Sequence, residues 1–164
     1  MDCFAEPVIG RRFAPTRWLA MTVTDNPMTS DLLFVYGTLM RGFDHPMAQL
    51  LARGADFIGE ARCRGRLYLV RHYPGLVLSD DADDVVFGQL VRLRQPAELL
   101  REFDMYEACG EGFSEPTEYV RQMLAVTREG EAAGQASTEA WTYIYNWPVT
   151  GLPRIASGRF LLEG

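Results

Sequence analysis

The chain has 164 residues, of which 48% are hydrophobic and 12% aromatic, and this is enough apolar material for one compact domain with its own core. Its 16 basic and 22 acidic side chains leave a net charge of -6, which argues against nucleic acid or an anionic membrane as the main partner, because phosphate binding requires a cationic surface. Every basic residue is an arginine and only His45 and His72 are histidines, so lysine nucleophiles are excluded and a histidine-rich metal site is disfavoured.

The first 30 residues mix prolines and polar residues without a clear period. We therefore expect residues 1–30 to be an N-terminal extension to a domain that spans residues 31–164. The cysteines, Cys3, Cys63 and Cys109, are odd in number and far apart, which indicates free thiols in a reducing, cytoplasmic compartment. No apolar run approaches the ~18 residues that a membrane span requires.

The first part of the predicted domain contains a strand, a turn and a helix. Residues 32–35 are a short apolar run that indicates a buried strand, and the run stops at the glycine turn Tyr36-Gly37-Thr38. From Pro46 the apolar residues recur with helical spacing as far as Gly54. Residues 57–70 are interrupted by glycines, which predicts strands with bends or bulges.

The second part contains more short strands and one more helix. Pro96 at a first helical position opens this helix, and Gly110 and Gly112 are expected to end it. Strands are predicted after the Tyr73-Pro74-Gly75 turn over residues 76–78, 85–93, 119–127 and 140–147. Short strands, two helices and glycines within strands indicate a small α+β domain with a curled sheet or a barrel.

The turn Tyr36-Gly37-Thr38-Leu39 is the first candidate for chemistry. A chain that leaves a buried strand through a glycine can aim successive N–H groups at one point, where they bind a carboxylate or a developing oxyanion without a basic side chain. Glycine turns are common, however, and spacing alone favours an ordinary strand-to-loop turn.

Glu107 is the second candidate, because it lies four residues after Phe103 and so on nearly the same face of the predicted helix. A carboxylate placed against Phe103 and Tyr106 is poorly solvated, which moves its pKa towards the range of a general acid or base. The alternative is a solvated glutamate at the edge of the core, which is the more common environment for this residue type.

Other features carry less weight. The acidic segment 80–84 lacks the spacing and terminal glutamate of a calcium loop, so a solvated turn is expected. Cys109 follows the end of the helix, where the helix dipole disfavours a thiolate, so we expect no reactive nucleophile there. Aromatic residues recur at every second position of the last strand, which suits core packing and ligand stacking equally: Trp141, Tyr143, Tyr145 and Trp147.

Several short motifs follow one another in a characteristic order. They are Val35-Tyr36-Gly37-Thr38-Leu39, Gly65-Arg66-Leu67-Tyr68, Tyr73-Pro74-Gly75, Asp104-Met105-Tyr106-Glu107, Tyr119-x-Arg121 and Ala140-Trp141-x-Tyr143. Each motif is weak alone, but the ordered set resembles the γ-glutamylcyclotransferase-like (AIG2-like) family over residues 31–162. The chain departs from this pattern after Glu107, where Ala108-Cys109 replace the glycine that directly follows in many members.

The resemblance implies a small mixed or antiparallel β-barrel with flanking helices around one cavity. It also implies that the glycine turn binds the γ-glutamyl part of a substrate through backbone amides, and that the family's catalytic glutamate corresponds to Glu107. The substrate-binding residues that it implies are Tyr36, Gly37, Thr38, Leu39, Tyr119 and Tyr145.

The family's reaction suits a chain without lysine. In a γ-glutamyl compound the α-amine can attack the γ-carbonyl, which releases 5-oxoproline and an amine or amino acid without a metal or cofactor. Burial raises the pKa of Glu107 and a bound ammonium lowers it, so the sequence leaves its starting protonation state open. The resemblance thus predicts a cofactor-free enzyme acting on a small γ-glutamyl substrate with Glu107 as acid and base; the alternative is a non-catalytic small-molecule binding module of the same fold.

Overall fold

The computed structural model describes residues 30–131 and 137–160. The chain divides into a unit of Met1–Ser30 and a unit of Asp31–Gly164, and every helix and strand given below belongs to the second unit. The predicted N-terminal extension, with Cys3, lies outside the described residues apart from Ser30 and stays a prediction. In the described ranges, no helix has both the length and the apolar character needed to cross a membrane.

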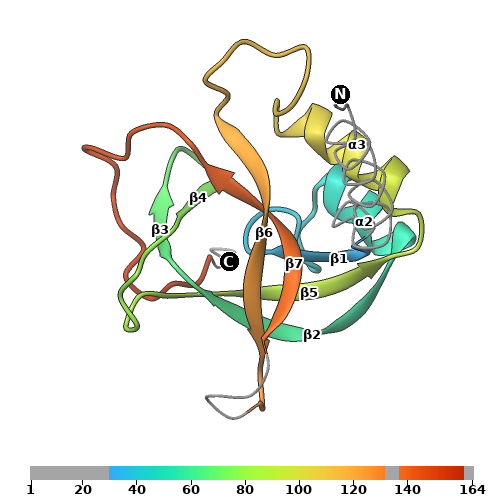
Figure 1. Cartoon of the computed structure of the whole chain (residues 1–164), viewed down its shortest axis with the longest axis horizontal. Helices are drawn as coiled ribbons and strands as arrows, with labels where there is room; N and C mark the ends of the chain where they lie inside the picture. The colour runs from blue at the N-terminus through green and yellow to red at the C-terminus, as the bar shows by residue number, and fades with distance from the viewer. Residues whose placement is uncertain (1–29, 132–136, 161–164) are drawn as a thin grey trace, which may run out of the picture. The chain divides into compact units, whose positions relative to one another are not determined.

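Five strands close into a barrel in the order β1-β5-β2-β6-β7 (Figure 1). They are β1 (Leu32–Val35), β2 (Ala55–Arg64), β5 (Val85–Leu93), β6 (Tyr119–Arg128) and β7 (Thr138–Tyr145). Neighbouring strands are antiparallel except for β1 and β7, whose parallel contact between Leu33 and Trp141 closes the barrel. The α+β barrel that the sequence predicts is therefore confirmed.

Two further strands, β3 (Arg66–Leu69) and β4 (Pro74–Val77), form a separate antiparallel pair. Figure 1 shows this pair on one side of the barrel and the two helices on the other. The pairing corrects the prediction of a turn at residues 73–75, since Pro74 opens β4, a strand position that does not require its missing N–H. The predicted irregularity in residues 57–70 is confirmed, because the register of β2 on β5 shifts between Phe57 and Gly59.

The helices are α2 (Pro46–Gly54) and α3 (Pro96–Tyr106), and both begin with a proline in the first turn, where no N–H is needed. The predicted bounds of α2 are confirmed. The predicted end of α3 at Gly110 is wrong, because the helix stops at Tyr106. The last strand also differs from its prediction, since β7 ends at Tyr145 and leaves Trp147 outside it.

Strand β1 divides its side chains between two hydrophobic clusters, because successive residues of a strand point to opposite faces. Leu33 and Val35 pack in the cluster that contains Phe103 of α3, and Phe34 packs in the other cluster with Leu90 of β5. Phe103 is completely buried. This packing brings the chain that follows β1 and the chain that follows α3 to the same cavity.

Candidate active site

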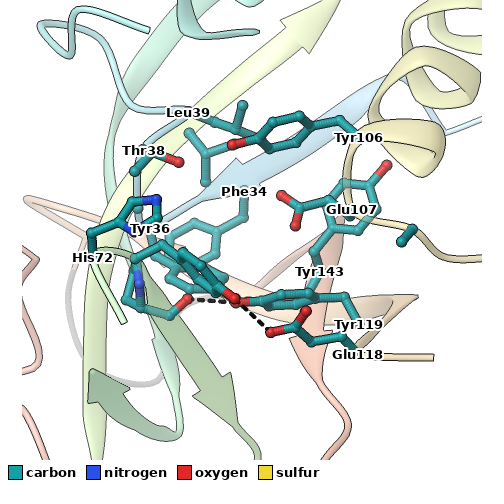
Figure 2. A pocket seen from close by; sticks show the side chains of 15 residues that line it. Phe34, Tyr36, Thr38, Leu39, His72, Tyr106, Glu107, Glu118, Tyr119 and Tyr143 are labelled. Atoms are coloured by element: carbon teal, nitrogen blue, oxygen red, sulfur yellow. Dashed lines mark hydrogen bonds between the residues drawn. The ribbon is translucent and has the colours of Figure 1, made fainter. Parts of the chain in front are cut away.

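A cavity of about 230 Å³ lies where β1, the end of α3 and the starts of β4 and β6 meet (Figure 2). Its walls come from parts of the chain that are far apart in sequence: Phe34, Val35, Tyr36, Gly37, Thr38, Leu39, His72, Tyr73, Pro74, Tyr106, Glu107, Ala108, Glu118, Tyr119 and Tyr143. The lining is rich in aromatic rings and includes two carboxylates, but it includes no arginine. Its size and mixed polarity suit a small polar ligand.

The glycine turn forms one wall of this cavity. The N–H of Met40 donates to the carbonyl oxygen of Gly37 at 3.0 Å, which closes the turn. A Cβ on Gly37 would lie 2.7 Å from Cγ of Pro74, so the close approach of the two segments requires glycine. Within residues 30–131 and 137–160, the N–H groups of Gly37, Thr38 and Leu39 have no backbone acceptor, and such a cluster of donors can bind an anionic oxygen.

Glu107 directly follows α3 at a helix end of the Schellman type. The N–H of Glu107 donates to the carbonyl oxygen of Phe103 at 2.8 Å, and the N–H of Cys109 donates to that of Asp104 at 2.9 Å. Between them, Ala108 has a φ of 52°, a left-handed conformation that usually takes glycine. The reversal of the chain turns the side chain of Glu107 into the cavity (Figure 2).

The electrostatic surroundings of Glu107 favour its neutral form. Its side chain is half-buried, and removal from water raises its pKa from 4.5 to about 7, with a smaller contribution from the negative charge of Glu118. It forms no ion pair with any residue in the described part of the chain. A carboxyl group with this pKa can both accept and release a proton near neutral pH.

Tyrosine hydroxyls around the cavity are held by hydrogen bonds to the protein. Tyr36 Oη donates to the carbonyl oxygen of Tyr143 at 2.6 Å, and Tyr119 Oη donates to that of Pro74 at 2.8 Å. Tyr143 Oη in turn donates to Asp104 Oδ1 at 2.8 Å. Burial raises the pKa of all three tyrosines, so these hydroxyls stay protonated and their rings form a fixed wall.

Behind this wall, Arg121 of β6 and Asp104 of α3 are joined by an ion pair. Arg121 Nη2 lies 3.4 Å from Asp104 Oδ2, and the Arg121 guanidinium lies 4.7 Å from the ring centroid of Trp141. Asp104 also accepts from Tyr143 of β7. The contacts of Asp104 therefore hold the end of α3 against β6 and β7, just before Glu107.

The second carboxylate, Glu118, precedes β6 and was not among the residues predicted from the sequence. Tyr73 Oη donates to Glu118 Oε1 at 2.8 Å. Burial and the neighbouring Glu118 raise the pKa of Tyr73 to about 12, so Tyr73 remains the donor in this bond. Figure 2 shows Glu107 and Glu118 on the same side of the cavity, opposite Thr38 and His72.

The structure brings most of the predicted site residues together. Those that line the cavity are Tyr36, Gly37, Thr38, Leu39, Glu107 and Tyr119. Tyr145 is not part of the lining; its ring packs edge-on against Tyr119, with 5.5 Å between the ring centroids. Its part in substrate binding stays a prediction, as do the roles of the other residues.

The predicted site residues leave out several residues of the lining: His72, Tyr73, Tyr106, Glu118 and Tyr143. Strand alternation gave a signal for Tyr143, which shares a face of β7 with Tyr145. Tyr106 was expected on the apolar stripe of the helix, but it is 43% exposed and its Oη lies 3.1 Å from His45 Nε2. The aromatic residues of β7 thus contribute both to the core and to the lining of the cavity.

The remaining candidates behave as structural residues. Cys63 and Cys109 are buried free thiols, and burial raises the pKa of each to about 12, which agrees with the expectation that Cys109 is unreactive. The acidic segment is not wholly solvated as predicted, because Asp84 is buried and forms ion pairs with Arg66 and Arg154. Over the described ranges, no group of three or more His, Cys, Asp or Glu side chains could hold a metal ion.

Comparison with known proteins agrees with this fold. Residues 33–162 match the family model described as "Gamma-glutamyl cyclotransferase, AIG2-like". A protein of Citrobacter rodentium is 33% identical over 131 residues, which cover 79% of this chain and 94% of that protein. A protein of Escherichia coli K12 is 35% identical over 133 residues, which cover 79% of this chain and 95% of that protein. Both bear the name gamma-glutamylcyclotransferase family protein YtfP.

Solved structures share the fold. The crystal structure of an AIG2-like protein from Mus musculus is similar with a TM-score of 0.62 and 25% identity, and the match covers 82% of this chain and 90% of that one. The solution structure of YtfP from Escherichia coli is similar with a TM-score of 0.51 and 28% identity, and the match covers 80% of this chain and 96% of that one.

Proposed function

The chain belongs to the AIG2-like γ-glutamyl cyclotransferase family, and on that premise we propose that it releases 5-oxoproline from a γ-glutamyl amine or γ-glutamyl amino acid, with Glu107 as general acid and base. One observation carries this proposal. A half-buried carboxylate with a pKa of about 7 shares a small cavity with a glycine turn whose N–H groups lack backbone acceptors within the described ranges.

The proposed reaction makes a ring from the substrate's own atoms. The α-amine nitrogen attacks the γ-carbonyl carbon, and the new C–N bond closes a five-membered lactam. The bond from the same carbon to the leaving nitrogen then breaks, and that nitrogen takes a proton and departs as an amine. Because the nucleophile is internal and no electrons are transferred to an acceptor, proton transfer and positioning are the tasks left to the protein.

Glu107 performs the two proton transfers in sequence. As a base it takes a proton from the α-ammonium, and as an acid it delivers this proton to the leaving nitrogen. The attacking nitrogen loses a second proton as the lactam forms, and this proton passes to water or to the released amine. A pKa of about 7 suits both directions, and one group in this role typically contributes ~10²–10⁴-fold to the rate. The ammonium of a bound substrate lowers the pKa of Glu107 again, which favours the base form at the start of the reaction.

The glycine turn holds the substrate on the opposite side. The N–H groups of Gly37, Thr38 and Leu39 bind an anionic oxygen, either the α-carboxylate or the oxyanion that develops on the γ-carbonyl. Confinement in about 230 Å³ holds the folded-back conformer in which amine and carbonyl are close, which lowers the barrier through effective molarity. Tyr36 and Tyr119 form the rigid wall of this space, and Tyr145 supports Tyr119 from behind.

Glu107→Gln tests the proposal, because it removes the ionisable group and keeps the shape of the side chain. A panel of γ-glutamyl compounds is incubated with parent and variant, and 5-oxoproline is measured by mass spectrometry. We expect turnover to fall by ~10²-fold or more while substrate still binds. Glu111→Gln, the same change at an exposed position outside the cavity, is the matched control and should keep the parent rate.

Two outcomes contradict the proposal in different ways. Release of 5-oxoproline by Glu107→Gln at the parent rate would remove Glu107 from the mechanism. Saturable binding of γ-glutamyl compounds to the parent protein with no 5-oxoproline from any of them would identify a non-catalytic binding module of the same fold.

A further inference from the structure

Tyr106 lies at the edge of the cavity, and the proposed ring closure gives it no role. It directly precedes Glu107 and lines the cavity, but 43% of it is exposed. Figure 2 shows its ring extending from the side of Glu107 towards Thr38 and Leu39, so its hydroxyl reaches the glycine turn. A hydroxyl in this place adds a side-chain donor to the N–H groups that the turn already provides.

His45 contacts this hydroxyl from outside the cavity lining. Tyr106 Oη lies 3.1 Å from His45 Nε2, and the two rings meet edge-on with 5.2 Å between their centroids. His45 is the N-cap of α2, where its Nδ1 accepts from the N–H of Met47 at 3.2 Å. Because α2 buries Ala48 and Leu51, the imidazole is held on a helix that is itself packed against the core.

The cap decides which way the hydrogen bond between His45 and Tyr106 runs. A ring nitrogen that accepts carries no proton, so the proton of the neutral His45 ring is on Nε2. His45 Nε2 therefore donates to Tyr106 Oη, and the phenol keeps its own O–H proton for a second partner. Burial raises the pKa of Tyr106 and a hydrogen bond with the side chain of Thr38 lowers it in part, so the hydroxyl stays protonated and able to donate on the side of the glycine turn.

We propose that the Tyr106 hydroxyl donates a hydrogen bond to the anionic oxygen that the glycine turn binds, and that His45 is the positioning residue that aims this hydroxyl. The inference rests on the ring closure proposed for the same cavity. A hydroxyl that already accepts from His45 Nε2 is a stronger donor, because linked hydrogen bonds polarise one another. It also loses little freedom when a substrate binds, since its position is set beforehand.

Tyr106→Phe tests the hydroxyl, because it removes one oxygen and keeps the ring that borders the cavity. Release of 5-oxoproline from a panel of γ-glutamyl compounds is measured for parent and variant. We expect kcat/KM to fall by about tenfold to a hundredfold, as for the loss of one hydrogen bond to a charged group. Tyr68→Phe, the same change on β3 outside the cavity lining, is the matched control and should keep the parent rate.

His45→Asn separates the two contacts of the imidazole. Asparagine is a good N-cap and keeps an acceptor for the N–H of Met47, but its side chain ends before the position of Nε2 and does not reach Tyr106. Urea unfolding should therefore give a stability close to that of the parent. We expect kcat/KM to fall by about threefold to tenfold, as for one neutral hydrogen bond, because the hydroxyl is still present but is no longer aimed.

The double variant shows whether His45 acts through Tyr106. Because phenylalanine has no hydroxyl to aim, His45→Asn should change kcat/KM little when Tyr106→Phe is already present, and the two losses should not add. Losses that add would mean that His45 affects turnover by another route, and they would overturn its assignment as a positioning residue.

Failure of this inference differs from failure of the proposed function. Release of 5-oxoproline by Tyr106→Phe at the parent kcat/KM would mean that the hydroxyl is not used, while the ring closure stands. If the parent releases no 5-oxoproline from any compound of the panel, the proposed function fails. Calorimetric binding of the same compounds to parent and Tyr106→Phe then decides the inference: weaker binding by the variant supports it, and equal affinity, or no binding by either protein, contradicts it.

Discussion

Asp84 and Glu107 are both carboxylates withdrawn from water, but their surroundings are opposite. Asp84 accepts from the hydroxyl of Ser79 and pairs with Arg66 and Arg154, and these hydrogen bonds lower its pKa to about 2. Glu107 has no ion pair among the described residues, and removal from water raises its pKa to about 7. The two pKa values are therefore about five units apart, because Asp84 accepts hydrogen bonds from Ser79 and from two arginines, whereas Glu107 has no such partner among the described residues.

This difference separates a structural carboxylate from a chemically useful one. Asp84 joins β3, through Arg66, to the segment after β7, through Arg154, and it stays ionised across the neutral range. Glu107 changes its protonation state in that range and borders a cavity that a ligand can enter. The partners of a carboxylate, more than its burial, decide which of the two roles it has.

A cation placed opposite Glu107 should make it resemble Asp84. Thr38→Arg introduces a guanidinium on the cavity wall that faces Glu107, which should lower the pKa of Glu107 and occupy the space of the substrate ammonium. We expect kcat/KM for release of 5-oxoproline to fall by ~10²-fold or more. Thr38→Gln, which is long but uncharged, is the control, and equal losses in both variants would show that bulk and not charge is responsible.

Stability should depend on pH in opposite directions at the two carboxylates. The pKa of Glu107 in the folded protein, about 7, lies above its ordinary value of 4.5, so its stabilising proton is lost as pH rises through this window. Glu107→Gln does not titrate and so does not lose this stability. Relative to the parent, its free energy of unfolding should rise by up to ~3 kcal/mol as the pH increases from 4.5 to values above 7. Urea unfolding at both ends of the window measures the gain, and an equal gain in Glu111→Gln would contradict the assignment.

Asp84→Asn should lower the midpoint of thermal unfolding by several degrees at neutral pH, because it leaves Arg66 and Arg154 without a carboxylate. The pKa of Asp84 is lowered from 3.8 to about 2, so its stabilisation is present above pH 3.8 and is lost as pH falls through about 2. The difference between variant and parent should therefore close in acid. Calorimetry against the exposed control Asp83→Asn checks this, and a difference that persists at low pH would contradict it.

The parts of the fold that depend on short-range signals were predictable. Strand β1 follows from a continuous apolar run, and α2 follows from a proline at its start and a glycine at its end. Glu107 could be chosen because its spacing from Phe103 places it beside a buried helix face and because the order of motifs resembles one family.

The contacts that decide the chemistry were not predictable from spacing. Arg66 and Arg154 lie 18 and 70 positions from Asp84, so nothing in the acidic run itself indicates that it is paired. Tyr73 lies 45 positions before Glu118, and only the pairing of strands brings them together. Single-sequence patterns report local periodicity, whereas these interactions depend on the closure of the barrel.

The smallest expected effect concerns the turn that aims Glu107 into the cavity. The sequence suggested that Gly110 ends α3, but Ala108 takes the left-handed position with φ of 52°. Ala108→Gly should stabilise the protein by at most about 1 kcal/mol, because the relief of ~1–2 kcal/mol of backbone strain is partly offset by the ~0.5–1 kcal/mol that glycine loses in conformational entropy. Gly110→Ala, at φ of 99°, should have the opposite sign. Urea unfolding of both variants decides the point: destabilisation by Ala108→Gly would mean that the methyl group of Ala108 matters more than its backbone, and that the orientation of Glu107 does not rest on a strained turn.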